Sequence, residues 1–332
     1  MNTILQIGAI LMLMACGSNN DKGKVDKRKT TGTIERLHTS LDKLINPTAK
    51  IEVIAEGFTR SEGPLWVEEH ELLLFSDVPN NKVYKWSETQ GLKEYLEASG
   101  YTGKTERGGE KGSNGLLLDR KGNLVLCQQG NRQVARMDAP LVLPKSRYIS
   151  LASKFNGKKL NSPNDIIQRS NGDLFFTDPA YGLNDQETEK KELSTNGVYK
   201  LDTLGTLTLL IDTLSMPNGL ALSPNEKKLI VGNSDNKKPM LFAYNIDVND
   251  SLIQAGIVFN FQKYGGAPDG FKIDQQGNIF AGGPGGIWIF NNEYIPIGKI
   301  KLPQAVSNCC LADDGKTLFI TARHQVLRLR MR

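Results

Sequence analysis

The residues best suited to chemistry are six oxygen-bearing side chains that occupy matching places along the chain. Each follows a short polar stretch and precedes an apolar run, and we call the set the anchors: Glu62, Asn114, Asn164, Asn218, Asp269 and Asn308. Two carboxylates and four amide carbonyls offer only oxygen ligands, a set that suits Ca²⁺ best and Mg²⁺ or Mn²⁺ next. Zn²⁺ is a further alternative, although zinc usually recruits Cys or His, and the three histidines of the chain fall outside the anchors.

A simpler explanation for the anchors is that they are turn residues. Asn or Asp before Gly forms turns, because both residues tolerate left-handed backbone and hydrogen-bond their own main chain. A single pair such as Asn218-Gly219 would indicate only a turn. Six oxygen-bearing residues at matching positions are better explained by a metal site. One of them, Glu62, is also of a residue type that is uncommon in turns.

The elements that must position the anchors form a repeat of about 50 residues. Each unit has a polar tripeptide, an apolar run, a turn such as residues 119–123, a second apolar run and a third strand, which is the pattern of antiparallel hairpins. This spacing leaves room for four strands per unit, as in the blades of a β-propeller. The sequence therefore predicts an all-β fold, a six-bladed β-propeller with four-stranded blades. A pair of β-sandwiches, the alternative, does not explain six regularly spaced tripeptides.

The ring also needs a closing strand, since unpaired edges invite association with other chains. Residues 49–58 precede the first unit and are expected to supply the outer strand of the last blade. A closed ring buries its own edges, so the expected state is a monomer.

The first residues of the chain indicate export. The apolar run from Ile4 to Met14 is too short to span a bilayer and fits the core of a signal peptide. The ending Leu13-Met14-Ala15-Cys16 resembles a bacterial lipobox and predicts lipidation of Cys16. No Lys or Arg precedes the run, which leaves a plain secretory signal or a buried N-terminal helix as alternatives. The predicted organisation is a lipoprotein signal at 1–16, a polar tether at 17–48 and a propeller at 49–332, lipid-anchored in the bacterial cell envelope and facing the periplasm or the outer surface.

Charge and cysteine content exclude several classes of protein. The net charge of +5 comes mostly from the predicted tether, so the propeller has no broad basic field for nucleic acid. Apart from Cys16, the cysteines are Cys127, Cys309 and Cys310, which form neither a disulfide framework nor a zinc motif. They are expected to be small apolar residues in strands.

Several motifs together resemble one known family. SEGPLW at 61–66, SPND at 162–165, PNG at 217–219 and PDG at 268–270 are similar to the senescence marker protein (regucalcin)/gluconolactonase/LRE-like family. FSDVPNNKVYKW and FTDPAYG resemble its bacterial gluconolactonase-like branch. The resemblance runs from about Ile51 to the C-terminus, with the motifs in the order of the family.

The resemblance implies a ligand set within the anchors. Glu62, Asn164, Asn218 and Asp269 are expected to coordinate one divalent cation at the bottom of a central cleft. Asn114 and Asn308 would lie nearby, in contact with the substrate or supporting the ligands, and Asp165 is a weaker candidate beside them. The chain departs from the family at Gln129, where relatives commonly carry a histidine.

The chemistry that the resemblance implies is metal-dependent hydrolysis of sugar-acid lactones. The cation would polarise the carbonyl and Asp269 would orient or deprotonate the attacking water, with direct attack by the carboxylate as an alternative. The chain has no G-x-S-x-G motif and few histidines, which argues against a serine triad. Competing hypotheses are another metal-dependent esterase or phosphotriesterase-like hydrolase, and a non-catalytic lipid-anchored binding propeller; the acidic pair Glu62 and Asp269 favours a hydrolase.

Two aromatic residues and two loops are further candidates for the surroundings of the cleft. Tyr181 and Trp66 would either line the cleft or pack between blades. Residues 101–111 and 185–193 are expected to form loops over the channel that set substrate specificity.

Overall fold

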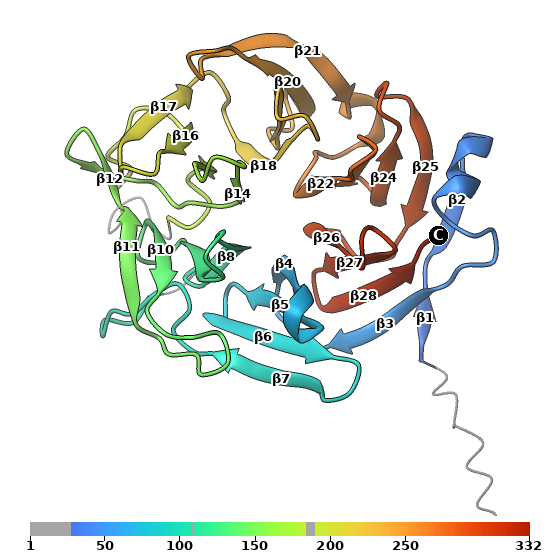
Figure 1. The fold of residues 1–332 in the computed structure, drawn as a ribbon, viewed down its shortest axis with the longest axis horizontal. Coiled ribbons are helices and arrows are strands. Elements are labelled where there is room, and N and C mark those ends of the chain that lie inside the picture. The colour runs from blue at the N-terminus through green and yellow to red at the C-terminus, as the bar shows by residue number, and fades with distance from the viewer. Residues whose placement is uncertain (1–27, 108, 184–189) are drawn as a thin grey trace, which may run out of the picture.

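The structure is a computed structural model that describes residues 28–107, 109–183 and 190–332. Six antiparallel sheets stand around one axis as the blades of a propeller (Figure 1). The predicted six-bladed β-propeller is therefore confirmed. No helix within the described ranges has the length and apolar character needed to cross a membrane.

Each blade is built on four strands, which run in chain order from the axis outward in blades 1 to 5, whereas the outer strand of blade 6 comes from the start of the chain. Blades 1 to 3 consist of β4 (Ser61–Val67), β5 (Leu72–Asp77), β6 (Lys82–Ser87) and β7 (Gly91–Leu96); β8 (Ser113–Leu118), β9 (Leu124–Gln128), β10 (Gln133–Met137) and β11 (Tyr148–Ala152); and β14 (Ile166–Gln168), β15 (Leu174–Asp178), β16 (Gly197–Leu201) and β17 (Leu207–Ile211). Blades 4 to 6 consist of β18 (Pro217–Leu222), β19 (Lys228–Asn233), β20 (Met240–Ile246) and β21 (Leu252–Asn260); β22 (Phe271–Ile273), β23 (Ile279–Gly283), β24 (Gly286–Phe290) and β25 (Pro296–Lys301); and β26 (Asn308–Ala312), β27 (Thr317–Ala322), β28 (Gln325–Arg330) and β3 (Ile51–Glu56). Minor elements are the hairpin of β12 (Lys154–Phe155) and β13 (Lys158–Lys159) and the 3-10 helices η2 (Glu68–His70) and η3 (Gln262–Tyr264).

The ring closes as the sequence predicts, because β3 from the start of the chain completes the last blade. It pairs antiparallel with β28, with Ala55 opposite Val326 and Glu52 opposite Arg328. Figure 1 shows β3 beside β28 although nearly the whole chain separates them. Blade 6 therefore has its outer strand from the N-terminal side and its other three from the C-terminal side.

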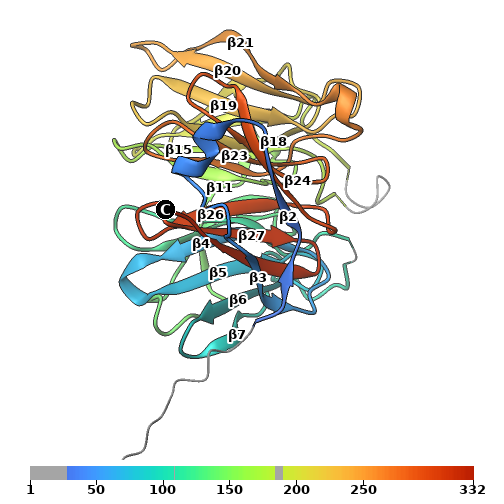
Figure 2. The same ribbon diagram turned by 90° about the vertical axis from the view of Figure 1, so that its right-hand side faces the viewer.

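Residues 28–48 differ from the expected polar tether. β1 (Thr30–Thr31) pairs with β3, and β2 (Thr33–Arg36) pairs with β25, so blades 6 and 5 each gain a fifth strand. Figure 2 shows this segment running along the outside of the propeller. The 3-10 helix η1 (Thr39–Lys43) buries Leu41 completely, and Ile45 just after it is equally buried. Residues 1–27, with the predicted signal, Cys16 and the first part of the tether, lie outside the described residues.

The hydrophobic core lies in six clusters, one between each pair of neighbouring blades. Alternate side chains of each strand face one neighbour or the other, so both faces of every blade are buried. Cys127, Cys309 and Cys310 are free and buried in these strands, which confirms their expected apolar role. The clusters hold the blades at fixed positions around the axis, and the innermost strands are positioned with them.

Candidate metal centre and active site

Every anchor lies at the start of the innermost strand of its blade. Glu62, Asn114, Asn218 and Asn308 are the first or second residues of their strands, whereas Asn164 and Asp269 come two residues before theirs. The six innermost strands contact one another in a closed ring around the axis. The anchors therefore meet at one level of the channel, as the repeat predicts.

The residue after most anchors is a glycine, and the close approach of the inner strands explains why. A Cβ on Gly219 would lie 2.5 Å from the carbonyl oxygen of Asp269 in the next blade. A Cβ on Gly63 would lie 2.0 Å from the carbonyl oxygen of Asn114, and Gly63 also has φ +52°. Side chains at these positions would push neighbouring blades apart, so the glycines let the anchors converge.

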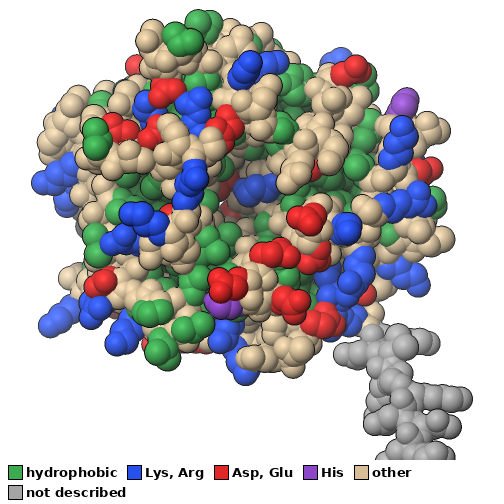
Figure 3. Space-filling model, viewed as in Figure 1, with side chains coloured by type: hydrophobic (Ala, Val, Ile, Leu, Met, Phe, Trp, Pro, Cys, Tyr) green, Lys and Arg blue, Asp and Glu red, His purple; other side chains and the backbone are tan. Residues whose placement is uncertain are grey.

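Five anchors line one cavity of about 390 Å³ at the axis, namely Glu62, Asn114, Asn164, Asn218 and Asp269. Its remaining polar lining includes Arg60, Glu110, Tyr181, Ser234 and Arg323, and its apolar side is formed by Ala267, Pro268, Ala305 and Val306. Figure 3 shows the centre of the ring as a hollow on one face of the molecule, with both acidic and basic side chains visible there. The structure thus brings together all four expected metal ligands and Asn114.

The two acidic anchors are electrostatically unsatisfied. Burial, reinforced by the charge of Asp269, raises the pKa of Glu62 well above its usual value. Burial also raises the pKa of Asp269 to about 7, although the Asn218 side chain opposes this shift. Within the described residues neither carboxylate forms an ion pair with Lys or Arg. The charge of Arg60, in the same cavity, opposes both pKa shifts only in part. Two buried like charges remain costly, and a divalent cation bound by both would remove the cost.

The donor set around this pair suits a hard cation. Beside the two carboxylates, Asn164 and Asn218 present neutral amide oxygens to the same cavity. In the part of the chain that the structure describes, no three His, Cys, Asp or Glu side chains gather as a metal group, so a zinc-type set of ligands is absent there. Oxygen ligands of mixed charge fit Ca²⁺, and the residues present therefore fit the ion that the sequence favours.

Asn308 and Asp165 do not line the cavity, so of the two roles expected for Asn308, this position fits a supporting residue rather than contact with the substrate. They belong to a neighbouring cluster in which Asn308 Nδ2 lies 3.5 Å from Asp165 Oδ2. The third member is Lys272, whose Nζ lies 3.6 Å from Asp165 Oδ2 and 3.3 Å from Asn308 Oδ1. Sequence reasoning missed Lys272, although a signal exists. Three residues after the other anchors stand Leu65, Leu117, Ile167, Ala221 and Leu311, and only this unit has a charged residue there.

Of the two candidate aromatic residues, Tyr181 lines the cavity and Trp66 does not. Trp66 stacks on Phe319 between blades 1 and 6, with ring centroids 5.2 Å apart. The Tyr181 hydroxyl lies near Asn218 and Ser234 without making a well-formed hydrogen bond, and burial raises its pKa, so it stays protonated.

The turn that carries Tyr181 is held by buried hydrogen bonds. The Asp178 carboxylate accepts from the backbone N–H groups of Asn161 and Ser162, each at 2.8 Å. Ser162 Oγ donates to the carbonyl of Pro179 and accepts from the N–H of Gly182. Asp178 is therefore a structural residue that fixes one wall of the cavity.

Gln129, the departure from the family, is fully buried and is not part of the cavity lining. Its side-chain amide has no hydrogen-bond partner among the described residues. It lies behind Gly182, where an added Cβ would approach the Gln129 Cβ to 2.7 Å. Gln129 therefore packs against the turn that carries Tyr181 and does not line the cavity itself.

The 101–111 loop reaches the cavity through Glu110, which forms an ion pair with Arg60. Arg107 of the same loop donates to the carbonyl of Gly182. These contacts join the loop to the cavity lining and to the turn that carries Tyr181. Residues 185–189 of the second expected loop lie outside the described residues.

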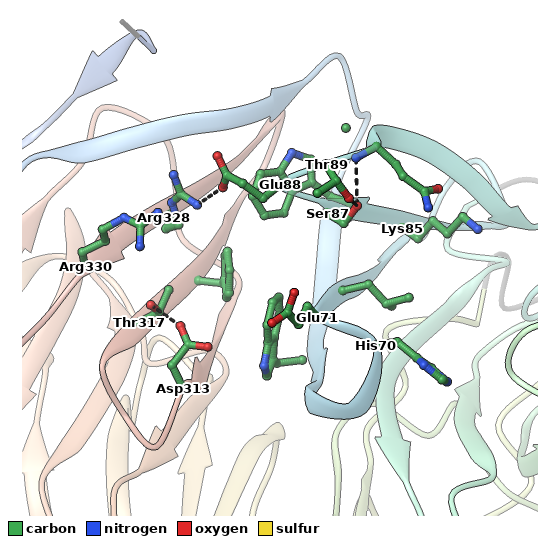
Figure 4. Close-up of a pocket in the computed structure, with 16 residues that line it drawn as sticks. His70, Glu71, Lys85, Ser87, Glu88, Thr89, Asp313, Thr317, Arg328 and Arg330 are labelled. Carbon is green, nitrogen blue, oxygen red and sulfur yellow. Dashed lines mark hydrogen bonds and ion pairs between the residues drawn. The ribbon is translucent and has the colours of Figure 1, made fainter. Parts of the chain in front are cut away.

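A second cavity, of about 310 Å³, lies between blades 1 and 6 and contains no anchor (Figure 4). Figure 4 shows Glu88 of blade 1 pointing toward Arg328 of blade 6, with Arg330 beyond it. Its lining combines the ion pair of Glu88 and Arg328 with the aromatic residues Trp66, Trp86 and Phe319, which pack between the two blades. This cavity belongs to the closure of the ring.

Comparison with known proteins agrees with this geometry. The family described as SMP-30/Gluconolactonase/LRE-like region matches residues 60–324. A gluconolactonase from Zymomonas mobilis subsp. mobilis is 40% identical over 312 residues, which cover 91% of this chain and 86% of the relative. The solved structure of a gluconolactonase from Xanthomonas campestris has a TM-score of 0.78 at 27% identity, over 91% of this chain and 97% of that chain. A calcium-binding protein, regucalcin, from Agrobacterium tumefaciens str. C58 shares the fold, with a TM-score of 0.65 at 14% identity over 83% of this chain and 92% of that chain.

Proposed function

The chain belongs to the SMP-30/gluconolactonase/LRE-like family, as its motifs predict, and we propose that it is a divalent-cation-dependent hydrolase of sugar-acid lactones. The observation that carries the proposal is the buried pair Glu62 and Asp269, set among amide oxygens in a cavity large enough for a small ligand. The gluconolactonases among the relatives support the class of substrate.

Four anchors would hold the cation. Glu62 and Asp269 supply charge, and Asn164 and Asn218 supply neutral oxygens that keep the bound ion electron-poor. Ca²⁺ is the ion that this set favours. When bound, the cation would supply Lewis-acid polarisation of the lactone carbonyl.

Asp269 is the residue proposed to handle the proton of the reaction. Its carboxylate accepts a proton from the attacking water as the water oxygen bonds to the carbonyl carbon. The bond between that carbon and the ring oxygen then breaks, and Asp269 returns the proton to the ring oxygen as it leaves. The product is the open-chain hydroxy acid, which ionises and releases one proton to solution.

The walls of the cavity would orient the substrate. Asn114 lines the cavity outside the proposed ligand set and presents an amide to the hydroxyl groups of the lactone. The apolar wall of Ala267, Pro268, Ala305 and Val306 covers the carbon face of the ring and excludes water from it. This division into a polar and an apolar wall suits a ring that has hydroxyl groups at its edge.

The proposal is tested by acid release from D-glucono-1,5-lactone in a pH-stat, with spontaneous opening subtracted. We expect turnover with Ca²⁺, none with EDTA, and a loss of at least about 100-fold in Asp269→Asn, since general-base catalysis contributes on this order. Asp274→Asn is the matched control. Asp274 follows the same strand β22, but its carboxylate accepts only within its own turn, from the backbone N–H groups of Gln276 and Asn278 and from the Asn278 side-chain amide. The activity of this variant should therefore stay unchanged. Full turnover by Asp269→Asn, or by wild type in EDTA, would contradict the proposal.

A further inference from the structure

The channel contains a third carboxylate, Asp165, whose charge the proposed metal ion does not balance. Asp165 is only 4% exposed and follows the anchor Asn164 directly, where four of the six units have glycine. Asp165 Oδ2 lies 3.5 Å from the side-chain nitrogen of the anchor Asn308, so the carboxylate belongs to the ring of groups around the axis. One divalent ion would neutralise Glu62 and Asp269 and leave Asp165 uncompensated.

Lys272 meets this carboxylate from blade 5, and its ammonium group is surrounded by oxygen atoms. Nζ lies 3.0 Å from the carbonyl oxygen of Phe271, 3.3 Å from Asn308 Oδ1 and 3.6 Å from Asp165 Oδ2. A carboxylate, an amide oxygen and a backbone carbonyl are the kinds of ligand that hard cations take in proteins. The ammonium group therefore occupies a place whose chemistry is that of a cation site.

The repeat itself indicates that these two residues belong together. Asp165 is the only charged residue among the positions directly after the anchors, and Lys272 is the only one among the positions three residues after them. The two departures have opposite charges, come from different blades and meet near the axis. Two independent surface charges would not be expected to coincide in this way.

We propose that Lys272 is a built-in cation that fills a second cation site, formed by Asp165, Asn308 and the Phe271 carbonyl, and thereby limits the channel to one divalent ion. The inference rests on the proposed metal centre for its charge count, since three carboxylates are balanced by one divalent ion and one ammonium group. Without the ammonium group, Asp165 keeps an unbalanced charge beside two neutral oxygen atoms. One of these, Asn308 Oδ1, also accepts from the backbone N–H of Cys309 and so is already oriented, and together the three oxygen atoms can bind a second ion.

The test is the number of Ca²⁺ ions bound per chain, measured by calorimetric titration of the metal-free full chain. We expect one ion for wild type and two for Lys272→Ala. We expect the fold to tolerate alanine at position 272, because Ala221 occupies the equivalent position of another unit. Lys272→Arg keeps the charge and should bind one ion. The double variant Asp165→Asn/Lys272→Ala removes both charges and should also return to one ion.

The outcomes separate this inference from the proposed function. One ion of unchanged affinity in Lys272→Ala would overturn it, and so would two ions in the double variant. If Lys272→Ala fails to fold while the double variant folds, the pairing of charges is supported; if neither folds, Lys272 is a packing residue and the proposal falls. A wild type that binds no Ca²⁺ while Lys272→Ala binds one would refute the proposed metal centre and leave this site standing.

Discussion

Glu62 and Asp269 are the two anchors with a charge, and the other four anchors have amides. Amide oxygens would extend the proposed ligand set without adding charge, so one divalent ion would suffice for the pair. In the neighbouring cluster, the negative charge of Asp165 is likewise balanced, here by the positive charge of Lys272. Charge balance among single residues thus determines how many ions the channel is expected to hold.

The glycine after an anchor offers a direct test of how the anchors are positioned. In Gly219→Ala the new Cβ would lie 2.5 Å from the carbonyl oxygen of Asp269, which must move. We expect a loss of stability of about 1–3 kcal/mol and weaker Ca²⁺ binding, measured by denaturant unfolding and calorimetry.

The matched control for this change lies in the same blade. Gly232→Ala in β19 would place its Cβ 3.5 Å from the nearest heavy atom, an ordinary contact, so both properties should change little. Equal effects of the two substitutions would refute the explanation by close approach.

At the residue scale the sequence predicted the anchors but not all of their surroundings. The repeat gives the level of each residue along the axis, and five of six anchors do share the cavity. It does not show how side chains from neighbouring blades pack. Asn308 lies against Gly270, where an added Cβ would be 2.1 Å from its amide carbon, and it meets Lys272 rather than the cavity. Such contacts join units far apart in the chain.

At the scale of elements, the joint between blades 6 and 1 is secured by more than the pairing of β3 with β28. Glu88, after β6, accepts from Arg28 at 2.6 Å and pairs with Arg328 of β28. Arg328 also pairs with Glu52 of β3 at 2.5 Å and is only 5% exposed. One network therefore joins the first blade, the closing strand and the N-terminal segment, beside the cavity of Figure 4.

This network predicts a dependence of stability on pH. The Arg28 hydrogen bond, with help from Arg328, lowers the pKa of Glu88 to about 2. A lowered pKa in the folded state means that the stabilisation is present above the unfolded value of 4.5 and is lost as the pH falls toward 2.

We therefore expect Glu88→Gln to lower the melting temperature at pH 7. The effect should be at most about 2 °C, since the carboxylate is half exposed. The difference from wild type should shrink between pH 4.5 and pH 2. Glu69→Gln, an exposed glutamate of η2, serves as control. A gap that stays constant down to pH 2 would show that Glu88 does not act through its charge.

Among the elements, the N-terminal strands were beyond sequence reasoning. β1 has two residues and β2 has four, too few for a periodic pattern, and they exist because β3 and β25 offer partners. Because the segment is rich in charged residues, its sequence does not indicate that Leu41 and Ile45 are fully buried. The closing strand β3 was predictable, because the repeat requires a strand that its last unit lacks.

At the scale of the whole molecule, the fold was predictable because the repeat is a property of the entire chain. Six units of similar design cannot bury their apolar faces alone, and stacking them in a ring buries both faces of each. The six clusters between blades are the observed result. A ring locked by its core holds the inner strands at fixed separations, so the oxygen atoms at the axis are arranged before any ligand arrives.

The proposed lactonase activity depends on one cation held by the anchors. The decisive experiment adds Ca²⁺ stepwise to the metal-free wild-type chain and records, in the same samples, the Ca²⁺ bound and the hydrolysis of D-glucono-1,5-lactone. We expect turnover to rise in proportion to bound Ca²⁺ and to level off at one ion per chain. Full turnover before any Ca²⁺ is added, or a filled site without turnover, would show that the bound cation does not drive hydrolysis.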